Sequence, residues 1–108
     1  MAAAPLPPDE EARLAALHDL EILDTAPEEA LDDVARLAAL ILDTPIAAVS
    51  LVDADRQWFK ASVGLEVPET PRELSFCAHT ILEHDGLLVV PDATADPRFS
   101  ANSLVTGE

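Results

Sequence analysis

The sequence has few of the residues that build aromatic cores or covalent cross-links. Its 108 residues include no tyrosine, one tryptophan, three phenylalanines and a single cysteine. One cysteine forms no internal disulfide, so the chain needs no oxidising compartment. The three glycines are never adjacent, which excludes a glycine-rich loop that cradles phosphates. Because apolar residues still make up 49% of the chain, we expect one globular domain whose core consists of small and medium aliphatic side chains.

Basic residues are also scarce: six Lys and Arg stand against 21 Asp and Glu, for a formal net charge of −15. An acidic surface repels phosphate backbones and anionic lipids, so nucleic acids and membrane surfaces are poor partners. A solvated acidic surface accounts for this charge, and recruitment of a basic partner is the alternative. No apolar run has the ~20 residues of a membrane-spanning helix, and the N-terminus lacks the basic and apolar regions of a signal peptide. We therefore expect a cytoplasmic protein.

Two helices are expected in the first part of the chain. Charged residues with Leu14 and Leu17 on one face predict a helix over residues 9–20. A second, amphipathic helix is expected over residues 26–42, with Thr25 as its cap and Glu28 at the capping-box position. Its apolar face carries Leu31, Val34, Ala35, Ala38, Ile41 and Leu42.

The middle of the chain predicts strands. Residues 46–52 are apolar at nearly every position, which is typical of a strand inside a sheet. Residues 57–63 alternate and form the other half of a hairpin, with Phe59, Ala61 and Val63 opposite Trp58, Lys60 and Ser62. Residues 64–71 contain two prolines and are expected to be loop.

A short helix is expected from a Ser75 cap to about residue 83, followed by a third strand over residues 87–90 and a turn-rich end. The side chains expected to face inward from this helix are Phe76, Cys77, Thr80 and Ile81. Three strands are too few to cover two long helices, so this α+β pattern is interrupted.

Several segments together resemble one known family. They are residues 20–25 (LEILDT) with Pro27-Glu28, 44–46 (TPI), 49–53 (VSLVD), 55–60 (DRQWFK), 63–65 (VGL), 75–79 (SFCAH), 89–93 (VVPDA), 96–99 (DPRF) and 102–107. In this order and at this spacing, the chain resembles the GAF domains found at the N-terminus of many bacterial sensor histidine kinases and diguanylate cyclases.

The resemblance implies a GAF-like, PAS-related antiparallel sheet with flanking helices. Residues 1–13 would be a flexible lead and the start of the N-terminal helix, and residues 14–108 a partial GAF domain. The family continues past Glu108 into strands in the middle of its sheet and a closing helix, so the fold would be incomplete at the C-terminus. The strand over residues 46–52 would then have one open side.

The resemblance also places candidate ligand contacts, because the helix after Ser75 forms one wall of the family's sensing pocket. The candidates on this helix are Ser75, Phe76, Cys77 and His79. Trp58 and Lys60 are candidates for a different reason: an aromatic and a cation on one strand face, with Arg56 at the turn, would cradle an anionic ligand or a linear tetrapyrrole. Each has a structural alternative: a Trp beside a Lys stem covers apolar surface, and a lone Cys is usually a small core residue.

No residue is expected to be catalytic. Cys77 and His79, with His84 nearby, are too few and too close to form a metal site. The context of Cys77 also differs from that of the bilin-attachment cysteine in phytochrome-type relatives. Asp53, Asp55 and Asp92 lie at expected turns, where aspartate caps the backbone. Nothing in the sequence supports a bound chromophore or cyclic nucleotide.

These observations favour a sensory or regulatory module that forms a homodimer and relays a signal to an output domain elsewhere, such as a histidine kinase or diguanylate cyclase. One alternative is a structural dimerisation element without a ligand. A second is a redox enzyme that depends on Cys77, and a third is a fragment without function of its own.

Overall fold

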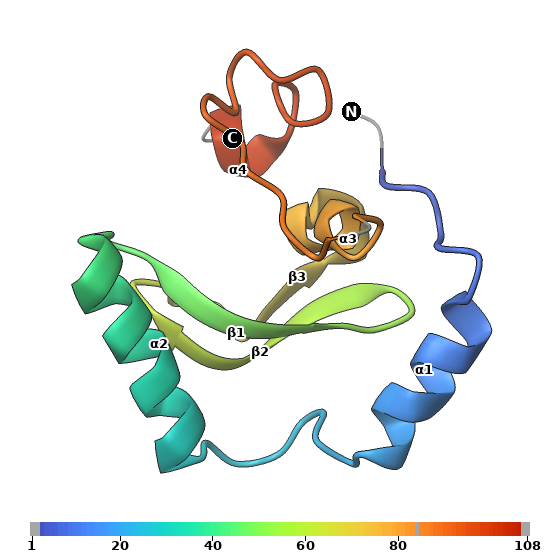
Figure 1. Ribbon diagram of the computed structural model, residues 1–108, viewed down its shortest axis with the longest axis vertical. Coiled ribbons are helices and arrows are strands. Elements are labelled where there is room, and N and C mark those ends of the chain that lie inside the picture. The colour runs from blue at the N-terminus through green and yellow to red at the C-terminus, as the bar shows by residue number, and fades with distance from the viewer. Residues whose placement is uncertain (1–2, 84, 107–108) are drawn as a thin grey trace.

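The computed structural model describes residues 3–83 and 85–106, and its helices flank a small antiparallel sheet (Figure 1). The strand order is β1-β2-β3. The α+β class is therefore as expected. The elements are α1 (Glu10–Asp19), α2 (Glu29–Leu42), β1 (Ala47–Val52), β2 (Arg56–Val63), β3 (Glu69–Pro71), a 3₁₀ turn η1 (Arg72–Leu74), α3 (Phe76–Thr80) and α4 (Ser103–Thr106).

Both N-terminal helices form, but α2 begins later than expected. Its N-cap is Glu28, in an extended conformation and without a side-chain cap bond. Thr25 is not the cap: its hydroxyl donates to the carbonyl of Ile22. The reason lies in the tertiary structure, because Lys60 binds Thr25 and the carbonyl of Ala26 and holds this stretch outside the helix.

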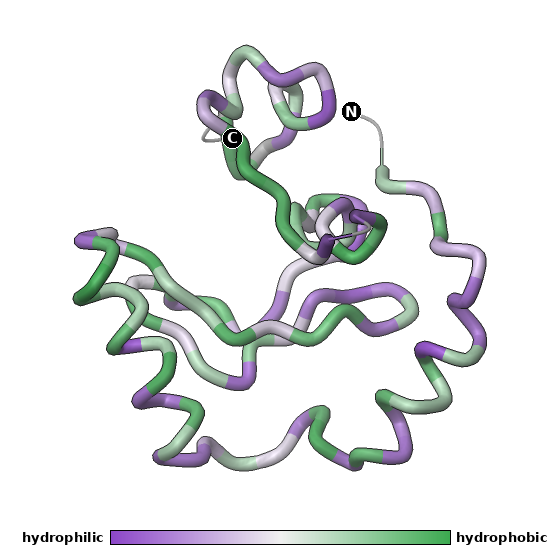
Figure 2. The backbone as a smooth tube through the Cα atoms, viewed as in Figure 1, coloured by the Kyte–Doolittle hydropathy of each residue, from purple (hydrophilic) through white to green (hydrophobic). Residues whose placement is uncertain are grey.

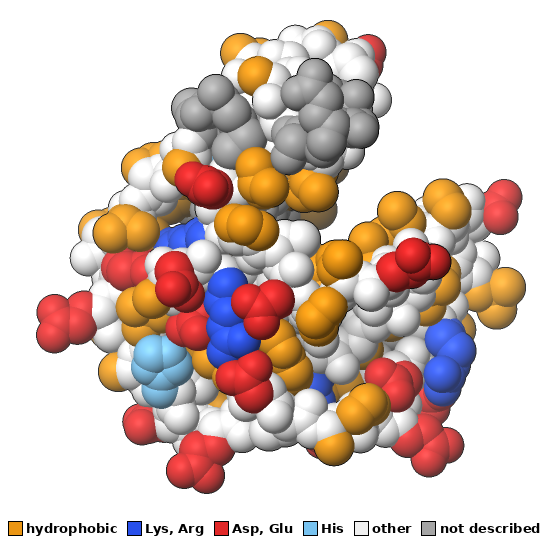
Figure 3. Space-filling view, turned by 180° about the vertical axis from the view of Figure 1, so that it is seen from behind, with side chains coloured by type: hydrophobic (Ala, Val, Ile, Leu, Met, Phe, Trp, Pro, Cys, Tyr) orange, Lys and Arg blue, Asp and Glu red, His pale blue; other side chains and the backbone are white. Residues whose placement is uncertain are grey.

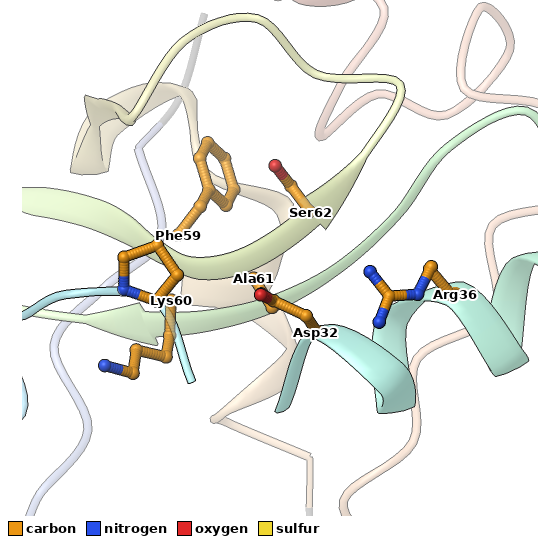
Figure 4. A pocket seen from close by; sticks show the side chains of 7 residues that line it. Asp32, Arg36, Phe59, Lys60, Ala61 and Ser62 are labelled. Carbon is orange, nitrogen blue, oxygen red and sulfur yellow. The ribbon is translucent and has the colours of Figure 1, made fainter. Parts of the chain in front are cut away.

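β1 and β2 form the expected antiparallel hairpin, from the Val52–Gln57 pair to the Ala47–Val63 pair, with a register shift between Val49 and Ser50. The shift is a bulge that adds one residue to β2. This bulge changes the alternation that the sequence predicts for β2. Figure 4 shows Phe59 and Ser62 leaving β2 on one side and Lys60 on the other. The prediction that Ser62 shares the face of Trp58 and Lys60 is therefore wrong.

β1 lies at the edge of the sheet, although its apolar sequence is typical of an interior strand. Within the described residues β2 is its one strand neighbour. Ile46, just before the strand, and Ala48, within it, are exposed. Because β1 is largely apolar on both faces and, in the described part of the chain, has no strand on one side, its backbone N–H and C=O groups and its apolar side chains are available to a further strand.

Three expectations after the hairpin are wrong. The expected loop over residues 64–71 contains β3. Pairing with the open side of β2 stabilises a strand there despite the two prolines. α3 ends at Thr80, and Ile81 is exposed while Ala78 is buried. Within residues 3–83 and 85–106, residues 87–90 form no strand and pair with none of the three strands. Figure 2 shows this stretch as a continuous hydrophobic connection between α3 and the C-terminal part.

The core consists mainly of small side chains, as the composition predicts. Its buried apolar residues are Leu17, Ala35, Val52, Trp58, Ala61, Ala78 and Phe99. Phe99 and Asn102, each only 1% exposed, attach the turn-rich segment 91–106 to α3 and to η1. Phe99 stacks on Phe76 of α3, and the Asn102 amide donates to the carbonyl of Leu74 in η1 at 2.9 Å. The unexpected helix α4 starts at this point, where the Asn102 side chain accepts from the N–H of Leu104 at 2.8 Å.

Candidate functional site

The six pocket candidates lie on two opposite faces of the sheet. Ser50 and Gln57 share one face by their register, and they contact Cys77 and Ser75 respectively. The strand residues between them in register, such as Trp58, point to the other face. Ser75, Phe76, Cys77 and His79 therefore belong to the α3 side. Trp58 and Lys60 belong to the side that the α1–α2 connection covers (Figure 1).

Ser75 is occupied by structural bonds. Its hydroxyl oxygen accepts from the N–H of Ala78 at 3.0 Å, as the predicted cap of α3. The hydroxyl itself donates to the side-chain carbonyl of Gln57. Both residues are buried, so these bonds fix α3 against β2.

Cys77 is half-buried, and its Sγ lies 3.2 Å from the hydroxyl oxygen of Ser50 on β1. Within residues 3–83 and 85–106, no histidine or cation forms a hydrogen bond with this thiol. A nucleophilic thiol normally has such a partner, which stabilises the thiolate. The contact with Ser50 joins α3 to the sheet.

Phe76 and His79 project from α3 onto Phe99. The Phe76 and Phe99 rings are stacked with centroids 4.0 Å apart, and the His79 ring meets Phe99 edge-on at 4.9 Å. Partial burial lowers the pKa of His79, and the positive charge of Arg98 lowers it further, so the imidazole is mostly neutral at pH 7. Arg98 is itself paired with Asp96 at 2.8 Å. This side of the sheet therefore presents rings and a balanced charge pair.

Lys60 has no free charge to offer a ligand. Its side chain is 1% exposed, and its ammonium group lies 2.9 Å from a carboxylate oxygen of Glu28. The same group donates to the hydroxyl of Thr25 at 2.6 Å and to the carbonyl of Ala26. It lies 6.0 Å from the ring centre of Trp58. This geometry matches the alternative in which the Trp and the Lys stem pack together.

A shallow hollow of about 350 Å³ opens where α2 meets the outer part of β2 (Figure 4). It is lined by Pro27, Asp32, Arg36, Phe59, Lys60, Ala61 and Ser62. Of the six pocket candidates it includes Lys60 alone. Arg36 pairs with Asp33 on its own helix. The hollow lacks the mostly apolar, enclosed lining of typical small-molecule sites.

Sequence reasoning missed the roles of Phe99, Asn102 and Arg72. An isolated Phe in a turn-rich, acidic stretch was a usable signal, because such a residue needs a burial site. Nothing in the local sequence marks Arg72 as buried. His84, Gly107 and Glu108, which enter the expectations from the sequence, lie outside the described residues.

Asp53, Asp55 and Asp92 lie at turns, as expected. Asp92 accepts hydrogen bonds from the backbone and hydroxyl of Thr94, which lower its pKa. No group of three or more His, Cys, Asp or Glu with metal-binding geometry occurs in the described part of the chain. None of the helices there is long and apolar enough to cross a membrane.

Two comparisons with known proteins identify the family of the chain. Residues 26–108 match the GAF domain family. The whole chain is 44% identical over 108 residues to a cyclic di-GMP phosphodiesterase of Pseudomonas aeruginosa. The match covers 100% of this chain but only 18% of that relative's length. The similarity is therefore to one region of a much longer protein.

Proposed function

The chain belongs to the GAF domain family, and we propose that it is the sensory or regulatory module of a bacterial signal-transduction protein. Catalysis would reside in an output domain of a longer chain. The relative's name supports turnover of cyclic di-GMP as the regulated process, and a histidine kinase or diguanylate cyclase output is the other option. The module itself would work in the cytoplasm.

The observation that carries a ligand-binding role is the partly uncovered α3-facing side of the sheet. Cys77 and Ser75 hold α3 over Ser50 and Gln57, whereas Phe59 on the same face is only half-buried and Ser62 is exposed. A small molecule would lie on this uncovered part, beside α3. His79 is mostly neutral at pH 7 and Arg98 is paired with Asp96. An uncharged, ring-containing ligand therefore suits this face better than an anion does.

We further propose that residues 14–108 are the front part of a GAF domain. The support is the open edge of β1, a strand whose sequence is that of an interior strand. Later strands of the domain would pair with this edge, so that a ligand on the sheet could alter their position and pass the signal to the output domain.

Native mass spectrometry of the chain, purified without denaturant, tests the ligand-binding role. We expect a retained uncharged small molecule, or a 1:1 complex with adenine as an uncharged ring probe. Ser62→Trp should block binding by filling the uncovered face. Ser100→Trp, an equally bulky change at an exposed position of the C-terminal segment, should not. Binding that is equally strong in both variants, or no binding in either variant and the parent, would reject this site.

A second candidate function, a dimerisation element, is favoured by the outer face of α2. Val34, Leu37 and Ile41 follow each other along one stripe and are 53%, 55% and 70% exposed. Apolar stripes at this spacing pack against a second helix. We propose that the same helix of a second copy covers it. Sedimentation analysis should find a dimer that Ile41→Glu dissociates, while Leu104→Glu, at an exposed position of α4, leaves it intact. A parent chain that is monomeric at all concentrations would reject the dimer.

A further inference from the structure

Most of the few cationic side chains in this acidic chain hold one N-terminal segment on the sheet. The chain has six Lys and Arg, and four of them join residues 10–28 to the sheet. These are Arg13, Arg56, Lys60 and Arg72. Residues 10–28, hereafter the latch segment, comprise α1 and its connection to α2. Figure 3 shows Lys and Arg side chains bordered by Asp and Glu side chains, close to a histidine, on this part of the surface.

The start of the latch segment is held through Glu10. Both carboxylate oxygens of Glu10 accept from the guanidinium group of Arg72, at 2.5 and 3.1 Å. The side chain of Arg72 is only 9% exposed, and it also donates to the carbonyl of Asp53 at 2.9 Å. Arg13 contacts Glu10 at 2.8 Å and donates to the carbonyl of Val52. Glu10 therefore lies between two arginines at the β1–β2 turn.

The remainder of the latch segment is held in the same manner. Arg56 forms a two-point pair with Asp24, at 2.8 and 2.7 Å. His18 lies 2.9 Å from Asp53. Lys60 binds the last residues of the segment through Glu28. An arginine–carboxylate pair with two hydrogen bonds fixes the relative orientation of its partners and also stabilises their contact. The segment therefore lies in one register on the sheet.

Apolar burial contributes little to this attachment. Between residues 10 and 28, Leu17 is the one buried residue; Leu14, Ile22 and Leu23 are half-buried. Core elements of small domains are normally attached by a continuous apolar face instead. The attachment of an element held by ion pairs depends on salt and on single charges.

We propose that residues 10–28 form an electrostatic latch, an acidic segment that docks reversibly on the cationic strip formed by Arg56, Lys60 and Arg72. The docked and released states differ in which charges are paired, while the β1–β2 hairpin remains folded in both. Such a two-state element can report events at the sheet to neighbouring parts of the protein. This device goes beyond the proposed sensory role and does not depend on a ligand.

Hydrogen–deuterium exchange of the full chain, followed by mass spectrometry, tests the latch. Glu10→Gln and Asp24→Asn each remove one charge from the segment with almost no change in shape. We expect amides of residues 10–20 to exchange roughly tenfold faster in each variant. The amides of β2 should keep their protection, which also shows that the variants fold. Asp33→Asn is the matched control, because Asp33 pairs with Arg36 on its own helix.

Salt provides an independent test in the unmodified chain. Raising NaCl from ~0.01 M to ~1 M should accelerate exchange in residues 10–20 several-fold, because the pairs with Asp24 and His18 are partly exposed and are screened. Two results would overturn the proposal. In one, the latch segment exchanges at the same rate in Glu10→Gln, Asp24→Asn and Asp33→Asn. In the other, residues 10–20 and β2 lose protection together, so the segment is an integral part of the fold.

Discussion

The ring of Phe99 lies on the ring of Phe76, with centroids 4.0 Å apart and planes inclined by 10°. The two residues are 23 positions apart in the sequence, and their contact joins the C-terminal segment to α3. Phe99 is almost completely buried, although its neighbours Ser100 and Ala101 are exposed. Phe99 is therefore the one fully buried apolar side chain among the described residues of the segment 91–106.

Phe99→Ala should detach this segment. The substitution removes the stacked ring and leaves a cavity that the small neighbouring residues cannot fill, for a loss of ~3 kcal/mol in docking free energy. Limited proteolysis should then cleave within residues 85–106 much faster than in the parent. Leu104→Ala is the control, because Leu104 is exposed and its truncation should leave cleavage unchanged. Equal cleavage of both variants and the parent would contradict this role of Phe99.

Asn102→Ala tests the polar half of the same attachment. The buried amide donates to the carbonyl of Leu74 and accepts from the N–H of Leu104. Its loss leaves two backbone groups without partners, which should lower the free energy of unfolding by ~1–3 kcal/mol in urea titrations. Asp85→Ala removes a similar but exposed bond, to the N–H of Leu87, and should have an effect below ~0.5 kcal/mol. A smaller effect at Asn102 than at Asp85 would refute the argument.

Features that depend only on residues close by in the sequence could be predicted. Ser75 caps α3 because its hydroxyl reaches the N–H of Ala78, three positions on in the sequence. The apolar residues of α2 recur at the period of a helix, and the segment is helical. β3 and the segment over residues 87–90 were misjudged because strands need partners. β3 finds one in β2, whereas residues 87–90, with a stronger strand sequence, find none in the described part of the chain.

The candidate site was harder to predict, because its charged side chains pair with residues that lie far away in the sequence. Trp58 and Lys60 do share a face, as expected from alternation. The pairing of Lys60 with Glu28, however, depends on where the α1–α2 connection runs. A bulge in β2 likewise depends on the partner strand, so the position of Ser62 could not be read from alternation alone.

Gly64 and Gly86 offer a matched test of backbone strain. Both have left-handed backbone angles, with φ of 78° and 72°. A Cβ at Gly64 would lie 2.2 Å from the carbonyl oxygen of Pro45, whereas one at Gly86 would meet nothing within 4 Å. Gly86→Ala should therefore cost only ~1 kcal/mol for the left-handed conformation.

Gly64→Ala should cost at least ~2 kcal/mol more than Gly86→Ala, because the β1–β2 sheet must shift to relieve the contact. Urea unfolding followed by the fluorescence of Trp58, the chain's single tryptophan, measures both variants. Equal midpoints for the two variants would show that residues 45 and 64 are not held close together in solution.

The environment of His79 predicts a dependence of stability on pH. Burial, helped by the charge of Arg98, lowers its pKa below the ordinary value of 6.5, while Asp96 opposes this shift. The unfolded chain therefore takes up a proton at His79 before the folded chain does as the pH falls. Stability should decrease as the pH drops from 7 through the usual pKa, and this contribution should level off below the folded-state pKa.

His79→Gln should remove this part of the pH dependence, whereas His18→Gln, a change at the exposed histidine of α1, should retain it. Asp96 does not confound the comparison between pH 5 and 7, because its hydrogen bonds with Arg98 hold its pKa at about 2. Urea unfolding at several pH values measures the slope, and an NMR titration of the imidazole gives the folded-state pKa directly. A His79 pKa above 6.5 would mean that the imidazole ring is not packed against Phe99.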